Sequence, residues 1–256
     1  MQGTNKKTLS MTFDQTPDFR YSEALRTLRT NLLFSGSKLK TILLTSTQPN
    51  EGKSTVSMDL ARVFAESGKK TLLVDADMRK SEVVQVHDIK EDTVGLSQIL
   101  TGQIPVEEGI YSVAEVPNMD IILAGPYAPN PTELFEDEMC ERLFDHIKSL
   151  QYDIVIIDTA PIGTVIDAAI LTRYADGAAL VCEAEVTTRR LLQRAKEQLD
   201  RTGIRFLGVI LNKVNMSKSG YYSSYYSYHK YGKSYGSYGY GGYGNPAQAD
   251  STDSKG

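Results

Sequence analysis

The stretch Pro49-Asn-Glu-Gly-Lys-Ser-Thr55 carries residue types that bind phosphate. It follows a short apolar run, Thr41 to Thr45, and opens a stretch of helical character that extends to about Ser67. A strand, a tight turn and the start of a helix form the context of a P-loop, in which backbone N–H groups converge on an anion. In this interpretation Lys53 reaches the β- and γ-phosphates of a nucleotide, and the Ser54 hydroxyl binds Mg²⁺.

The match to the usual P-loop pattern is imperfect, because the first glycine of the pattern falls at Thr47. The position before Glu51 is Asn50, and asparagine tolerates a left-handed backbone, so we expect the loop to close. Gly52 lets the backbone approach the phosphate closely. The competing interpretation is a surface turn at a helix start. The predicted phosphate-binding residues are Asn50, Glu51, Gly52, Lys53, Ser54 and, at the edge, Thr55.

Three aspartates stand at the ends of apolar runs. Asp75 and Asp77 follow Leu72-Leu-Val74, and Asp158 follows Ile154-Val-Ile-Ile157. A carboxylate in such a place is poorly hydrated and gains from a nearby cation, which beside a P-loop is Mg²⁺ with its waters. One aspartate alone would more often be a turn or helix N-cap. Three of them beside a P-loop favour a metal-dependent phosphate site.

These residues must be positioned by the middle of the chain, where short apolar runs alternate with helical stretches. Such a pattern predicts a parallel sheet covered on both faces. The fold class is therefore doubly wound α/β, with a mostly parallel sheet and helices on both faces. Ligands of such sheets bind at the carboxyl ends of the strands. The expected strands are Thr41–Thr45, Thr71–Asp75, Asp120–Leu123, Ile154–Asp158, Gly177–Cys182 and Phe206–Leu211, with a helix over about residues 132–150.

Composition sets the remaining bounds. The formal net charge of -4 gives no reason to expect nucleic acid as a partner. The longest apolar runs are too short to cross a bilayer, and residues 1–10 are polar, without the apolar stretch of a signal peptide. We therefore expect a cytosolic protein whose two cysteines, Cys140 and Cys182, are reduced thiols in or near the core.

The chain divides by composition into residues 1–38, mixed and partly helical, residues 39–215, the P-loop domain, and residues 216–256. From Ser217 onward there is no Leu, Ile, Val, Phe or Met, so we expect this tail to be disordered. The tail nevertheless holds ten of the fifteen tyrosines, separated by Gly and Ser. They are Tyr221, Tyr222, Tyr225, Tyr226, Tyr228, Tyr231, Tyr235, Tyr238, Tyr240 and Tyr243.

Taken together, these motifs resemble the bacterial tyrosine kinases (BY-kinases) of capsule and exopolysaccharide synthesis. The resemblance covers residues from about 20 to 243. It rests on Gln48-Pro-Asn-Glu-Gly-Lys-Ser54, Val74-Asp-Ala-Asp-Met-Arg79, the strand ending at Asp158, Glu23-Ala-Leu-Arg-Thr-Leu-Arg29, Pro129-Asn-Pro-Thr-Glu-Leu134 and the tyrosine cluster. These kinases often have glycine where this chain has Asn50. The related partitioning and division-site ATPases carry a signature lysine where it has Gln48.

The resemblance implies a protein-tyrosine kinase that uses ATP and Mg²⁺. Lys53 and Ser54 would bind the phosphates and the metal, and Asp77 and Asp158 would hold the metal directly or through water. Asp75 is the candidate base for the attacking phenol, although Asp77 is an open alternative. Arg79 would help to hold these acids or a neighbouring subunit, and Asn212 would contact adenine.

The resemblance also implies an assembly. Glu23, Arg26 and Arg29 match an oligomerisation motif; from spacing alone they would be an intrahelical ion pair. We expect a ring of subunits, each phosphorylating the tail tyrosines of the next. We further expect a separate transmembrane modulator that activates the kinase at the inner face of the cell membrane, an opposing tyrosine phosphatase, and a role in capsular or exopolysaccharide synthesis and export.

Two other functions are also compatible with the sequence. The chain could be an ATPase switch that changes partners on hydrolysis, with a tail that is only adhesive. It could also be a condensing protein whose stacked tyrosines drive self-association, although this leaves the P-loop unexplained. Phosphate on the tail tyrosines would discriminate the kinase from both.

Overall fold

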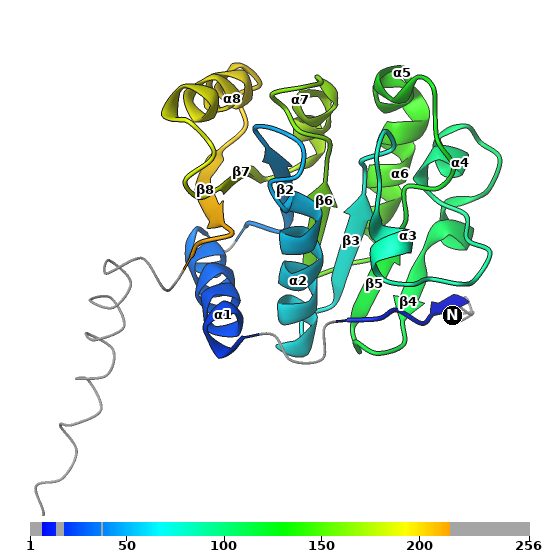
Figure 1. Cartoon of the computed structure of the whole chain (residues 1–256). Helices are drawn as coiled ribbons and strands as arrows, with labels where there is room; N and C mark the ends of the chain where they lie inside the picture. The colour runs from blue at the N-terminus through cyan, green and yellow to red at the C-terminus, as the bar shows by residue number, and fades with distance from the viewer. Residues whose placement is uncertain (1–6, 14–17, 37, 216–256) are drawn as a thin grey trace, which may run out of the picture. The chain divides into compact units, whose positions relative to one another are not determined.

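Eight strands form a single sheet in the computed structural model, which describes residues 7–13, 18–36 and 38–215 (Figure 1). The sheet order is β1-β4-β5-β3-β6-β2-β7-β8. All neighbours pair in parallel except β4 and β5, which are antiparallel. The strands are β1 (Lys7–Leu9), β2 (Thr41–Ser46), β3 (Thr71–Asp75), β4 (Tyr111–Val113), β5 (Met119–Ile122), β6 (Ile154–Asp158), β7 (Gly177–Glu183) and β8 (Phe206–Asn212).

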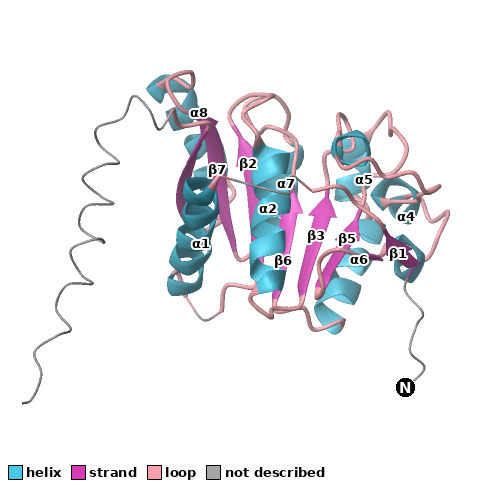
Figure 2. Ribbon diagram, turned by 60° about the horizontal axis from the view of Figure 1, so that its bottom comes forward, coloured by secondary structure: helices cyan, strands magenta, loops and turns pink. Residues whose placement is uncertain are grey.

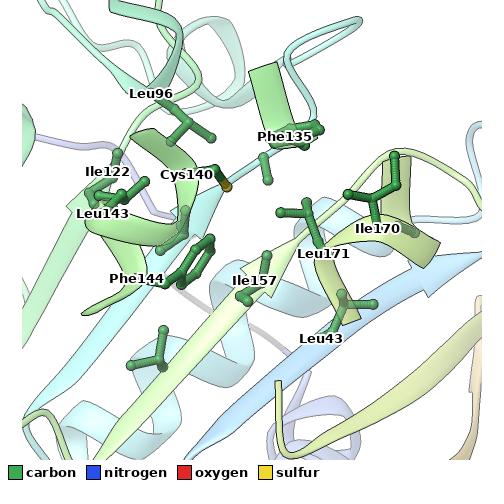
Figure 3. Packing of buried hydrophobic residues seen from close by; sticks show 14 of the residues in the cluster. Leu43, Leu96, Ile122, Phe135, Cys140, Leu143, Phe144, Ile157, Ile170 and Leu171 are labelled. Carbon is green, nitrogen blue, oxygen red and sulfur yellow. The ribbon is translucent and has the colours of Figure 1, made fainter. Parts of the chain in front are cut away.

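Helices cover both faces of this sheet (Figures 1 and 2). One core, which includes Leu32, Phe64 and Val83, packs α1 (Phe19–Phe34), α2 (Lys53–Glu66) and α3 (Val83–Val86) against one face. The other core, part of which is drawn in Figure 3, lies between the second face and five helices. These are α4 (Leu96–Leu100), α5 (Pro131–Glu136), α6 (Glu138–Ser149), α7 (Asp167–Leu171) and α8 (Arg189–Arg201); the 3-10 turns η1 (Val106–Gly109) and η2 (Thr172–Tyr174) complete the described elements.

The doubly wound, mostly parallel α/β fold predicted from the sequence is confirmed. The central strands β3 and β6 are buried along their whole length, which is why they read as continuous apolar runs. Their register places Asp75 directly beside Asp158. Both cysteines are buried free thiols, as expected.

The prediction of one helix over about residues 132–150 was wrong. The chain leaves helical geometry at Asp137, where ψ is 152°, so α5 ends and α6 begins. The Asp137 carboxylate accepts a hydrogen bond from Met139 N at 2.8 Å and caps α6. A polar residue that can cap a helix thus competes with continuation of the previous one.

The N-terminal region contributes more than a helix, because β1 pairs with β4 at one edge of the sheet. By contacts, the chain divides after Val214 into two units. The expected disordered tail, with its ten tyrosines, lies outside the described residues. Within the described part of the chain, no helix is long and apolar enough to cross a membrane.

Candidate active site

The phosphate-binding loop lies between β2 and α2 and has the backbone that the sequence predicted. Asn50 has φ 67° and Gly52, the N-cap of α2, has φ 81°, so both lie in the left-handed region. Asn50 thus adopts a left-handed backbone, which asparagine tolerates better than most other non-glycine residues. The helix α2, of fourteen residues, begins directly after this loop, so the unpaired N–H groups of its first turn are available to an anion there.

Glu51 supports this loop with a buried side chain, which is only 4% exposed. Its carboxylate accepts hydrogen bonds from Thr47 N at 2.7 Å, Thr47 Oγ1 at 2.7 Å and Gln48 N at 3.0 Å. The Thr187 hydroxyl, from the segment after β7, donates to the same carboxylate. The side chain of Glu51 thus braces the loop, and this residue would meet a phosphate through its backbone N–H. No local sequence signal marks this role, since Thr187 is 136 positions away.

The end of β8 holds the loop from the other side. Asn212 Nδ2 donates to the carbonyl of Glu51 at 3.0 Å, and Lys213 Nζ donates to the carbonyl of Asn50 at 2.6 Å. Lys213 also pairs with Glu183 at 2.8 Å. The structure therefore places Asn212 at the P-loop, and its expected contact with adenine stays a prediction. The contribution of Lys213 was missed.

Lys53 lies at the centre of a buried charge cluster. Its Nζ is 2.8 Å from Asp158 Oδ1, 3.1 Å from Ser54 Oγ and 3.8 Å from Asp77 Oδ2. The lysine and Asp158 side chains are 6% and 2% exposed. Ser57 Oγ also donates to Asp158 Oδ1, at 2.8 Å. The structure thus brings together Lys53, Ser54, Asp77 and Asp158, four residues that the sequence assigned to the phosphate and metal site. Ser57 was missed.

The donor set of this cluster fits Mg²⁺. Asp158 Oδ2 is buried and has no hydrogen-bond partner within the described residues, which leaves a carboxylate oxygen free to accept from a cation or its water. Carboxylates and a serine hydroxyl are hard oxygen ligands, which Mg²⁺ prefers together with nucleotide phosphates. Ser54, Asp77 and Asp158 supply that set around the P-loop.

Asp75 sits beside this cluster and is fully buried, at 1% exposure. Burial, followed by repulsion from Asp158, raises the pKa of Asp75 to about 7; a hydrogen bond from Ser81 and the charge of Lys53 oppose this rise. Asp75 Oδ1 accepts from Asp77 N at 3.2 Å. A carboxyl with a pKa near neutrality is suited to take a proton at physiological pH.

Other predicted residues lie elsewhere. Thr55 is exposed at the edge of the site, as expected. The guanidinium of Arg79 forms its ion pair with Asp167 of α7, and not with Asp75, Asp77 or Asp158. On α1, Glu23 pairs with Arg26, whereas Arg29 Nη1 donates to Val63 O of α2 at 3.1 Å, so Arg29 also has a role within the subunit.

The fold and this site define a nucleotide-binding protein of the P-loop class. Residues 39–193, from just before β2 into α8, match a family model described as an AAA domain. The match covers more than half of the chain and includes the P-loop and all three aspartates. The chain therefore belongs to this class, whose P-loop binds ATP with Mg²⁺.

Relatives and solved structures narrow the class. The chain is 40% identical over 205 residues to the tyrosine-protein kinase CpsD of Streptococcus pneumoniae, covering 79% of this chain and 89% of the relative. It is 39% identical over 206 residues to the tyrosine-protein kinase YwqD of Bacillus subtilis (strain 168), covering 80% and 86%. The crystal structure of the chimerical protein CapA2B2 superposes with a TM-score of 0.73 at 32% identity, over 81% of this chain and 94% of that one. The chain belongs to the BY-kinases of capsule and exopolysaccharide synthesis and is a protein-tyrosine kinase.

Proposed function

We propose that this kinase transfers the γ-phosphate of ATP to the tyrosines of its own C-terminal tail. The observation that carries the proposal is the convergence of Lys53, Asp77 and Asp158 at the P-loop. Beside them lies the carboxyl of Asp75, whose pKa is raised to about 7. The same chain carries ten tyrosines after residue 216, among Gly and Ser.

In the proposed step, the phenol oxygen of a tyrosine forms a bond to the γ-phosphorus, and the bond to the bridging oxygen of ADP breaks. The phenol has an ordinary pKa of about 10, so its proton needs an acceptor. Asp75 is that acceptor, because a carboxyl with a raised pKa holds the proton better than an ordinary one. Lys53 offsets the charge on the transferring phosphate, and the N–H groups of residues 50–55 hold the phosphates in place.

Ser54, Asp77 and Asp158 would hold Mg²⁺, which supplies further charge neutralisation at the phosphates. Lys53 now pairs with Asp158 at 2.8 Å. A bound nucleotide offers Lys53 a stronger anionic partner and frees the Asp158 carboxylate for the metal. Asn212, already in contact with the loop, would lie near the adenine.

The proposed transfer between subunits is supported by the length of the tether. A Gly/Ser-rich random coil of about 20 residues has a root-mean-square reach of roughly 25 Å, and tethering raises the local concentration of an acceptor to about the millimolar range. In the proposed ring, Glu23, Arg26 and Arg29 of α1 contribute to the contact between neighbours. Each tail then enters the site of the next subunit.

The proposed setting is the inner face of the cell membrane. The kinase would be cytoplasmic and peripheral, held and activated there by a separate transmembrane modulator, and reversed by a tyrosine phosphatase. Cycles of tail phosphorylation would regulate the synthesis and export of a capsular polysaccharide or exopolysaccharide. The likeness to the CpsD and YwqD kinases supports this setting.

The test is the intact mass of the purified protein after incubation with Mg-ATP, beside Lys53→Met and Asp77→Asn. We expect several additions of about 80 Da that map to residues 216–256, absent in both variants. If the wild type stays unmodified, the cytosolic segment of the modulator is added. ATP hydrolysis without any tail phosphate, even then, would contradict the proposal and favour the ATPase switch.

A further inference from the structure

A second charged cluster lies beyond the P-loop and has no part in the proposed transfer step. Arg79 Nε is 2.6 Å from Asp167 Oδ2, and Arg79 Nη2 is 3.0 Å from Asp167 Oδ1 and 2.9 Å from Thr132 Oγ1. The Thr132 hydroxyl donates in turn to Asp167 Oδ1 at 2.8 Å. We call these three side chains the loop clamp.

The loop clamp is a closed network around a buried carboxylate. Asp167 is 1% exposed, so its charge needs full compensation, and the two parallel bonds from the guanidinium provide it. Thr132 completes the network, because its hydroxyl accepts from Arg79 and donates to Asp167. Each side chain therefore holds the other two in one geometry.

The three residues come from loops that follow three neighbouring strands. Arg79 follows β3, Thr132 lies in the first turn of α5 after the loop from β5, and Asp167 begins α7 after the loop from β6. In the sheet these strands stand in the order β5-β3-β6. The loop clamp thus joins three adjacent connections at the carboxyl ends of the strands, where Asp75 and Asp158 also lie.

This position matters because the acids of the site are divided between two of those connections. Asp75 and Asp77 belong to the β3 side, and Asp158 ends β6. Asp77 lies two residues before Arg79, and its carboxylate accepts from Lys80 N at 3.1 Å. Ala76 N donates to Asp158 O at 2.7 Å, so the first residue after β3 is also tied to β6. The segment with Asp77 is therefore anchored at both ends.

We infer that Thr132 and Asp167 are positioning residues for phosphoryl transfer, acting through Arg79 on the segment that holds Asp77. This gives a role to the segment Pro129–Leu134, which the transfer step leaves unexplained. The inference rests on the proposed role of Asp77. A misplacement of about 1 Å in a catalytic group can lower a rate by about 100-fold, so a clamp of this kind acts on turnover.

The experiment compares wild type with Thr132→Val and Asp167→Asn, in the full chain with Mg-ATP. Thr132→Val keeps the size of the side chain and removes only the hydroxyl. We expect kcat to fall by about 10- to 100-fold, while the affinity for ATP stays within about twofold, because Lys53 and Ser54 do not contact the loop clamp. The combined variant should lose little more than the stronger single one.

A second readout follows the loop itself without nucleotide. Hydrogen exchange of the amides of residues 76–80 should become about tenfold faster in Thr132→Val, with the amides of α2 unchanged. The matched control is Glu138→Gln, which breaks the exposed pair with Arg142 on α6 and should change neither readout. An unchanged kcat, or an unchanged exchange at residues 76–80, would overturn the inference.

The release of ADP is measured beside tail phosphorylation to separate the two proposals. If the wild type releases ADP but its tail gains no phosphate, the proposed function fails. The loop clamp is then still tested by the rate of ADP release, which also needs Asp77 in place.

Discussion

Two buried carboxyls that stand side by side have different surroundings, and these support the different roles proposed for them. Asp158 lies 2.8 Å from Lys53, so a cation compensates its charge in the fold. Asp75 forms no ion pair within the part of the chain that the structure describes. Its pKa is raised to about 7 by burial and by repulsion from Asp158, against the hydrogen bond from Ser81. In the proposed mechanism, the first carboxylate therefore suits a metal and the second suits a proton.

The raised pKa of Asp75 predicts how stability depends on pH in the protein without nucleotide or metal. The folded chain binds this proton up to about pH 7, whereas an unfolded chain releases it near its ordinary pKa of 3.8. The stability of the wild type should therefore fall as the pH rises between these values. Asp75→Asn removes this pH-dependent loss of stability. The free energy of unfolding of the variant, relative to that of wild type, should therefore rise from about pH 4 to about pH 7 and then level off, with a total rise of about 4 kcal/mol at most.

Chemical denaturation across this pH range measures the difference. The matched control is Asp145→Asn, which changes an exposed carboxylate on α6 that pairs with Lys148 and should show no such trend. A difference between Asp75→Asn and wild type that is independent of pH would contradict the assignment of the raised pKa to this residue.

At the scale of elements, the P-loop depends on contacts from distant parts of the chain. Gly52 has φ 81°, and a Cβ there would collide with Asn212 Nδ2, which donates to the Glu51 carbonyl. Gly68, just after α2, has nearly the same φ, 86°, but nothing within 4 Å of an added Cβ. An alanine at Gly68 therefore has only the cost of a left-handed backbone, whereas an alanine at Gly52 has the same backbone cost and a steric clash in addition.

Gly68→Ala should lower the free energy of unfolding by about 1 kcal/mol and leave ATP binding unchanged. Gly52→Ala should have the same backbone cost and in addition displace Asn212 from the loop, which weakens ATP binding by about tenfold or more. Calorimetric titration with Mg-ATP and thermal melting measure both effects. Equal ATP affinity in the two variants would show that the contact with Asn212 does not shape the loop.

The elements that position the site were largely predictable, because β2, β3 and β6 are buried on both faces and read as apolar runs. The short strands β1 and β4 have three residues each and no such run, so they were missed. Within the site, Lys53, Asp77 and Asp158 were placed by their motifs. The brace from Thr187 to Glu51 and the pairing of Arg79 with Asp167 join residues 136 and 88 positions apart, and no local pattern indicates them.

At the scale of the whole molecule, the residues expected to join subunits differ in what they do within one subunit. The Arg26 side chain is 56% exposed, and among the described residues its ion-pair partner is Glu23 of the same helix. Such a pair contributes little stability at a surface. Arg29 instead donates to Val63 O and ties α1 to α2. Only Arg26 and Glu23 are therefore free to contact a neighbour without loosening the fold.

This difference gives a test of the proposed ring. Arg26→Ala should convert the oligomer to monomers. At a dilution at which wild type is also monomeric, its melting temperature should stay within about 1 °C of wild type, since a surface pair contributes about 0.5 kcal/mol. Arg29→Ala should lower the melting temperature by several degrees as well, because it leaves Val63 O without its side-chain donor. Sedimentation velocity and thermal melting separate the two effects, with Arg142→Ala on α6 as the matched surface control. If Arg26→Ala sediments like wild type and Arg142→Ala, the contact between subunits does not use this motif. Tail phosphorylation between subunits would then need another surface to bring them together.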